Sequence, residues 1–161
     1  MPRRTRRRSS ALRRRSVWAR SQGNTNIGAN SMAIDLLDAY RETEGTGGIA
    51  GCTVGRIRFQ LAYTAASGAS MPVVGITRAD RTVTNVPNPA NQNDQFADWM
   101  FWQACPLAGT GSDAAAFCDI DVKSMRKLDE VNQTVYFVAQ NVGDGGDLVA
   151  YYASSVLLLL P

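Results

Sequence analysis

The chain has 161 residues, no histidine and three cysteines, and its 17 lysines and arginines against 14 aspartates and glutamates give a net charge of +3. This length fits one domain with a sizeable core. The absence of histidine excludes a Ser-His-Asp or Cys-His catalytic pair, a histidine metal ligand and an imidazole pH switch.

The charge is divided unevenly along the chain. Residues 1–20 hold nine arginines and no acidic residue. These arginines are Arg3, Arg4, Arg6, Arg7, Arg8, Arg13, Arg14, Arg15 and Arg20. Residues 21–161 carry eight basic and 14 acidic residues, a net charge of −6. The sequence therefore predicts a +9 arm over residues 1–20 and one folded domain over residues 21–161.

The composition of the arm indicates what it binds. Its arginines repel one another and few apolar residues lie between them, so we expect the arm to be disordered. A guanidinium group matches phosphate oxygens, and neutralising phosphates releases counterions. The nine arginines are therefore predicted to bind nucleic acid without base specificity. A nuclear-localisation patch and a solvated tail remain alternatives. A mitochondrial transit peptide would need an amphipathic face, and a secretory signal an apolar core; the arm has neither.

The next residues give mixed signals before the first clear strand. Residues 21–30 indicate a linker or an edge strand, and residues 31–40 a helical turn with Ser31 as its cap. Residues 41–52 are rich in glycine and predict a loop. Over residues 53–64 apolar and polar residues alternate, which predicts a half-buried strand. The apolar set is Ile57, Phe59, Leu61 and Tyr63.

Five further segments predict strands, separated by loops rich in glycine, proline and asparagine. They are residues 71–79, 98–105, 117–125, 134–141 and 148–160. The last strand is long and apolar, so it is expected to be central rather than to anchor the chain in a membrane. Residues 84–95 predict a long loop and residues 143–147 a tight turn.

Seven or eight short strands without a strong amphipathic helix are typical of an all-β antiparallel sandwich or barrel. An α/β nucleotide-binding domain would instead alternate strands with helices of about 10–15 residues.

Two aspartates provide the sharpest candidate for chemistry. Asp119 and Asp121 stand two positions apart on a predicted strand, so they share a face and could bind Ca²⁺ or Mg²⁺. An exposed strand face partly neutralised by Lys123 is the preferred explanation of the pair, and turn chemistry alone explains Asp144 and Asp147. We therefore expect no metal site, no cofactor and no enzymatic activity.

Other notable residues have structural interpretations. Trp99, Phe101 and Trp102 are expected to pack on both faces of a buried strand, with a subunit contact or base stacking as alternatives. The basic segment 123–127 indicates a solvated turn or a second basic spot. Three cysteines, far apart at positions 52, 105 and 118, indicate buried, reduced side chains rather than paired disulfides.

An arginine-headed arm followed by a β-only, mildly acidic body resembles the single jelly-roll coat proteins of small icosahedral viruses. Two fragments are similar to segments of short arginine-headed coat proteins. One runs from VPNP at 86–89 to DWMFW at 98–102, and the other is DVKSMRK at 121–127. The resemblance implies a jelly roll of about eight strands in two packed sheets. The body is small for such a coat, so some strands must be short.

The resemblance also implies a function. Copies of the chain would assemble into an icosahedral shell, with the nine arginines facing genomic RNA or DNA and no membrane involved. The protein would be located in the virion, and in the host nucleus or cytoplasm during assembly. The alternative is a small cellular β-barrel protein, ribosomal or nucleoid-associated, that binds nucleic acid as a monomer.

Overall fold

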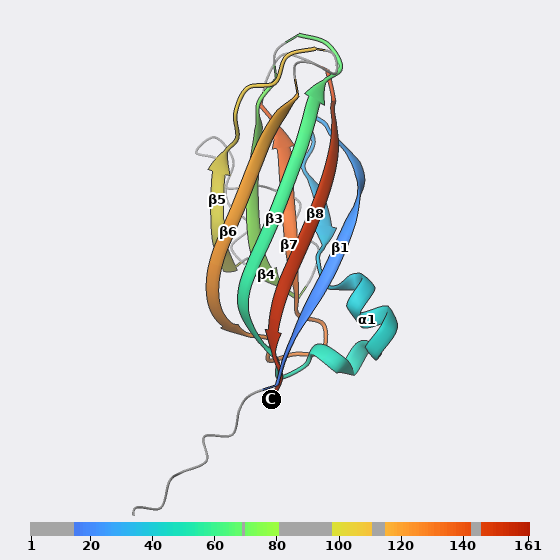
Figure 1. Ribbon diagram of the computed structural model, residues 1–161, viewed down its shortest axis with the longest axis vertical. Coiled ribbons are helices and arrows are strands. Elements are labelled where there is room, and N and C mark those ends of the chain that lie inside the picture. The colour runs from blue at the N-terminus through green and yellow to red at the C-terminus, as the bar shows by residue number, and fades with distance from the viewer. Residues whose placement is uncertain (1–14, 69, 81–97, 111–114, 143–145) are drawn as a thin grey trace, which may run out of the picture.

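The computed structural model describes residues 15–68, 70–80, 98–110, 115–142 and 146–161 (Figure 1). The strands are β1 (Ser16–Ile27), β2 (Met32–Asp35), β3 (Thr53–Ala65), β4 (Pro72–Ala79), β5 (Asp98–Ala104), β6 (Ala116–Lys127), β7 (Thr134–Asn141) and β8 (Leu148–Leu159). Helix α1 (Asp38–Glu44) and the short 3₁₀ helix η1 (Thr46–Ile49) join β2 to β3. The predicted loop at 84–95 lies outside the described residues, as does most of the predicted turn at 143–147.

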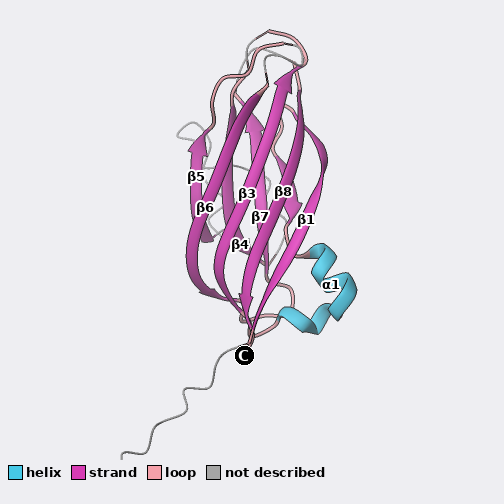
Figure 2. Cartoon of the chain, viewed as in Figure 1, coloured by secondary structure: helices cyan, strands magenta, loops and turns pink. Residues whose placement is uncertain are grey.

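Two four-stranded antiparallel sheets face each other (Figure 2). The first sheet has the order β1-β8-β3-β6 and the second the order β2-β7-β4-β5. Most successive strands therefore lie in different sheets. This Greek-key connection is the arrangement of an eight-stranded jelly roll. The predicted fold class is confirmed, with all eight strands present and β8 inside the first sheet.

The core lies between the sheets because apolar residues alternate along the strands. The set predicted for β3 is buried, and Phe59 of that strand stacks on Phe137 of β7 with ring centroids 3.8 Å apart. The ring of Tyr152 in β8 is also nearly parallel to that of Phe59, with ring centroids 5.8 Å apart. This stack joins the two sheets near the middle of the sandwich.

The helical turn predicted for residues 31–40 is wrong in its first half. Residues 32–35 pair with β7 as strand β2, and helix α1 lies largely in the segment predicted as a loop. The change occurs at Asp35, whose carboxylate accepts hydrogen bonds from the Leu37 amide at 2.9 Å and the Thr134 hydroxyl at 2.6 Å. Arg41 of α1 forms an ion pair with the same carboxylate. Pairing with a distant strand overrides the local preference.

Helix α1 ends at Gly45, where φ is +83° and the amide donates a hydrogen bond to the Arg41 carbonyl oxygen. Glycine adopts this left-handed backbone without a steric penalty. None of the helices that the structure describes is long and apolar enough to cross a membrane.

The predicted boundary between arm and body at residue 20 is also wrong. Strand β1 begins at Ser16, and its twelve residues pair with β8. Ala19 is buried and Val17 packs against the core. The arginine-rich composition hides this strand in the sequence, because Arg20 occupies one of its outward positions while the inward positions carry only small or β-branched residues. Residues 1–14 lie outside the described residues.

Candidate nucleic-acid and assembly surfaces

Two of the nine arginines predicted to bind nucleic acid lie within the described residues. Arg15 precedes β1, and its carbonyl oxygen accepts a hydrogen bond from the Leu160 amide at 2.8 Å. The chain therefore enters the first sheet beside the end of β8, at the pole where the C-terminus lies (Figure 1). The other seven lie outside the described residues; they are Arg3, Arg4, Arg6, Arg7, Arg8, Arg13 and Arg14.

Arg20 projects from the outer face of the first sheet. It is opposite Ser155 of β8, and Ser155 is opposite Arg58 of β3. Arg58 is in turn opposite Asp121 of β6. Residues in register on adjacent strands project to the same face, so these four side chains form one row across the sheet.

A second row lies beside the first, closer to the pole where β1 begins. Trp18 is opposite Leu157, which is opposite Arg56, and Arg56 is opposite Lys123. The guanidinium of Arg58 lies 5.6 Å from the centre of the Trp18 ring, within the range of a cation–π interaction. We call the four cations of these rows, Arg20, Arg56, Arg58 and Lys123, the basic rows.

The basic rows carry a surplus of positive charge. Their four cations face one carboxylate within the two rows, that of Asp121, which leaves a net charge of +3. The Nε atom of Arg56 donates to Asp121 at 2.7 Å, and a second guanidinium nitrogen contacts the other carboxylate oxygen. This hydrogen bonding lowers the pKa of Asp121 and raises that of Arg56. Arg20, Arg58 and Lys123 remain available to bind anions.

The same geometry bears on the cation hypothesis for Asp119 and Asp121. The two carboxylates do share the outer face of β6, as predicted. Asp121, however, is occupied by Arg56, a stronger neutralising partner than the Lys123 that the sequence indicated. No group of three histidine, cysteine, aspartate or glutamate side chains that could hold a metal ion occurs within the described ranges.

The predicted basic spot at 123–127 divides into two parts. Lys123 belongs to the basic rows, whereas the last two residues face carboxylates. Arg126 lies 3.4 Å from Asp98, and Lys127 lies 3.1 Å from Asp129. Arg78 of β4 lies 3.2 Å from the Asp98 carboxylate. The end of β6 is therefore close to charge balance.

The opposite half of the same outer face is apolar. Phe117, Ala62 and Tyr151 form a row across β6, β3 and β8. The rings are unusually open to solvent, with 67% of Phe117 and 61% of Tyr151 exposed. Val149 precedes Tyr151 on the same face of β8 and is 46% exposed.

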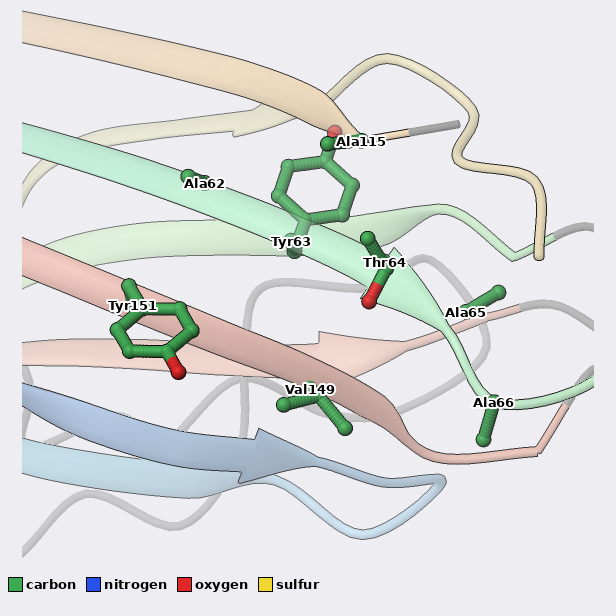
Figure 3. A pocket seen from close by; sticks show the side chains of 8 residues that line it. All are labelled: Ala62, Tyr63, Thr64, Ala65, Ala66, Ala115, Val149 and Tyr151. Atoms are coloured by element: carbon green, nitrogen blue, oxygen red, sulfur yellow. The ribbon is translucent and has the colours of Figure 1, made fainter. Parts of the chain in front are cut away.

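A hollow of about 490 Å³ opens beside this row (Figure 3). Figure 3 shows Tyr151 and Val149 on β8 next to Ala62 and Thr64 on β3. The hollow is lined by Ala62, Val149 and Tyr151 among others. We call this hollow, together with the row that includes Phe117, the apolar end. Contiguous exposed apolar surface of this kind marks an interaction site more often than a free surface.

The aromatic strand β5 differs from the prediction. It is the edge strand of the second sheet rather than a strand buried on both faces, and Trp102 is 56% exposed. Trp99 and Phe101 are only partly buried; Trp99 packs over Gly75 of β4 and Phe101 against the main core. Core packing is therefore confirmed for two of the three aromatics and wrong for Trp102.

The sequence did not identify Trp18, Arg56 or Arg58 as surface-site residues. The alternation over 53–64 placed the two arginines on the polar face of a strand. Their proximity to Arg20 depends on β8 lying between β1 and β3, which no local pattern encodes.

The strand order places the chain in the class of single jelly-roll proteins. In structure it is similar to a chain of turnip yellow mosaic virus, with a TM-score of 0.43 and 12% identity over 89% of this chain and 92% of that one. It is also similar to a chain of infectious bursal disease virus, Gx strain, with a TM-score of 0.34 and 14% identity over 89% of this chain and 31% of that one. No protein-family model and no curated protein sequence matches the chain.

Proposed function

We propose that the chain is a structural coat protein whose copies assemble into a closed icosahedral shell around a nucleic-acid genome. The observation that carries this proposal is the division of one sheet face into two halves. The basic rows lie near the point where the arginine-rich segment enters the sheet, and the apolar end lies at the other pole. One half suits a polyanion and the other a protein neighbour.

The nine arginines bind the genome in this proposal, and the basic rows extend the same surface. Arg20 belongs to both sets, because it lies on β1 and in register with Arg58. Contacts of arginine with phosphate are independent of base identity and weaken with added salt. RNA and DNA are therefore both suitable partners.

The partners at the apolar end are other copies of the chain. In a shell every copy presents the same surfaces, so a patch of exposed rings can be covered at each symmetry-related contact. The protein is then located in the virion, after assembly in the host nucleus or cytoplasm, and needs no membrane.

A monomeric nucleic-acid-binding protein of the cell is the second candidate. The observation that favours it is the Trp18 ring, which is 38% exposed and lies beside Arg58 on an open sheet. An aromatic ring next to an arginine can stack on a base. This function requires no contact between copies.

The experiment that tests the proposal compares the full chain with a variant lacking residues 2–14, both expressed and purified under identical conditions. We expect both to fold, because Arg15 and all of β1 are retained. The full chain should sediment as large particles that protect nucleic acid from nuclease, and the variant should lose that protected nucleic acid. Stoichiometric binding by a monomer at every salt concentration would instead support the second candidate.

A further inference from the structure

Two of the three cysteines lie together where the edge strands β5 and β6 meet. The Sγ atoms of Cys105 and Cys118 are 2.7 Å apart, and each residue is only 3% exposed. The residues are 13 positions apart in the sequence, which indicated unpaired cysteines. The prediction of buried, reduced side chains is confirmed for all three cysteines, which are free thiols in the structure, and the fold brings two of them together.

The two sulfurs are held from different sheets. Cys105 directly follows β5, and its amide donates a hydrogen bond to the Pro72 carbonyl oxygen of β4 at 2.9 Å. Cys118 belongs to β6 and is paired with Leu61 of β3. Packing of the sheets therefore fixes their separation. Sulfurs in a disulfide are about 2.0 Å apart, so a small side-chain rotation would bring these two to bonding distance.

From this geometry we infer that Cys105 and Cys118 form an intramolecular disulfide on exposure to a peroxide, cross-linking the two sheets along one edge of the sandwich. This inference concerns the folded subunit alone and does not depend on the proposed coat function.

The hydrogen bonds around the pair assign the two roles. The Cys105 thiol donates to Cys118, and so does the side-chain amide of Gln103, at 3.1 Å. The bond from Cys105 lowers the pKa of Cys118 and raises that of Cys105. Because the thiolate is the reactive form, Cys118 is the attacking group and Cys105 the resolving group.

The reaction is balanced with hydrogen peroxide as the oxidant. The Cys118 thiolate attacks one peroxide oxygen, the O–O bond breaks, and hydroxide leaves to become water by taking up a proton. Cys118 is then a sulfenic acid. The sulfur of Cys105 attacks that of Cys118, the S–O bond breaks, and the oxygen departs as water with the Cys105 proton. Two thiols are oxidised to one disulfide, and one peroxide is reduced to two waters.

Cys52 provides an internal control in the same chain. It is fully buried, it donates to the Gly48 carbonyl oxygen at 3.6 Å, and burial raises its pKa. A buried thiol with a raised pKa reacts slowly with peroxide. We therefore expect Cys52 to remain reduced while the pair oxidises.

The test treats the reduced full-length protein with hydrogen peroxide, alkylates the remaining thiols in denaturant and digests without reduction. Trypsin cleaves after lysine and arginine, so Cys105 and Cys118 occur in one peptide, 82–123, and Cys52 in another, 42–56. We expect the first peptide to be unalkylated and lighter by two hydrogens, and the second to carry one alkyl group.

Three results would overturn the inference: both thiols of peptide 82–123 alkylated, both oxidised to sulfinic acid, or the peptide found only as a disulfide-linked dimer. Three single serine variants serve as controls for which cysteines form the cross-link. Cys52→Ser should still form the cross-link, whereas Cys105→Ser and Cys118→Ser should not. Wild-type protein alone decides the matter if a variant fails to fold.

Discussion

The cations on the outer face of the first sheet differ in whether a carboxylate neutralises them. Arg56 is satisfied by Asp121, whereas Arg58 faces the Trp18 ring and Arg20 faces a serine. Of the four cations, Arg56 is therefore the one held by a carboxylate, whereas Arg20, Arg58 and Lys123 remain available to a bound anion.

The variant Arg58→Gln tests this difference between cations. Loss of one phosphate contact should weaken binding of a single-stranded oligonucleotide and reduce the slope of log affinity against log salt by about one. The slope is measured by fluorescence anisotropy over a salt series. Lys127→Gln is the control, because it removes the same charge from a side chain that contacts Asp129. Equal slopes for the two variants would contradict the basic rows as a binding surface.

Asp35 organises the passage from β2 to α1 through a single carboxylate. Removing it in Asp35→Ala leaves the Leu37 amide and the Thr134 hydroxyl without this acceptor, and leaves Arg41 with Asp38, at 3.4 Å, as its carboxylate partner. We expect the free energy of unfolding to fall by about 1–3 kcal/mol, measured by urea denaturation. Asp38→Ala, which removes a 66% exposed carboxylate from the same segment, should change it by less than about 0.5 kcal/mol. A smaller effect at Asp35 than at Asp38 would show that this network is not stabilising.

Among the elements, strand β1 connects the arginine-rich segment to the folded body and is itself part of the first sheet. Its outward residues include Trp18 and Arg20, and its inward residues include the buried Ala19 and Ile27. The element is therefore part of the sandwich and of the basic rows at once.

Deleting residues 2–20 should consequently unfold or destabilise the protein, unlike the deletion of residues 2–14. The longer deletion removes five of the twelve residues that pair with β8 and exposes that central strand at one end. Thermal unfolding followed by circular dichroism compares the two variants. Identical melting curves would mean that residues 16–20 do not contribute to the sheet.

Strands with a clear period of two, or with clear loops on either side, were predictable from the sequence, whereas β2 and the first residues of β1 were not. Strands β3 and β6 each have one apolar face, so alternation alone located them and their buried sides. Strand β2 has four residues of intermediate burial, and only its pairing with β7 explains it. The candidate surfaces differ in the same way. The arginines of the arm could be identified from the sequence, whereas the basic rows could be recognised only once the strand order was known.

In the assembled molecule, we expect the apolar end to be a contact between copies. Phe117→Ser should leave the subunit folded, because this ring is 67% exposed, but should prevent particle formation. Met125→Ser is a matched control on the same strand and face, with 69% of the residue exposed near the other pole. Analytical ultracentrifugation separates particles from monomers. Particles formed equally by both variants would place the contact elsewhere.

The most direct test of the coat-protein proposal is electron cryomicroscopy of the full-length protein expressed with nucleic acid present. From the proposed coat function we expect closed shells of uniform size, with the basic rows facing enclosed nucleic acid and the apolar ends covered by neighbouring subunits. Monomers alone across the whole salt range, or shells that carry the basic rows on their outer surface, would contradict it.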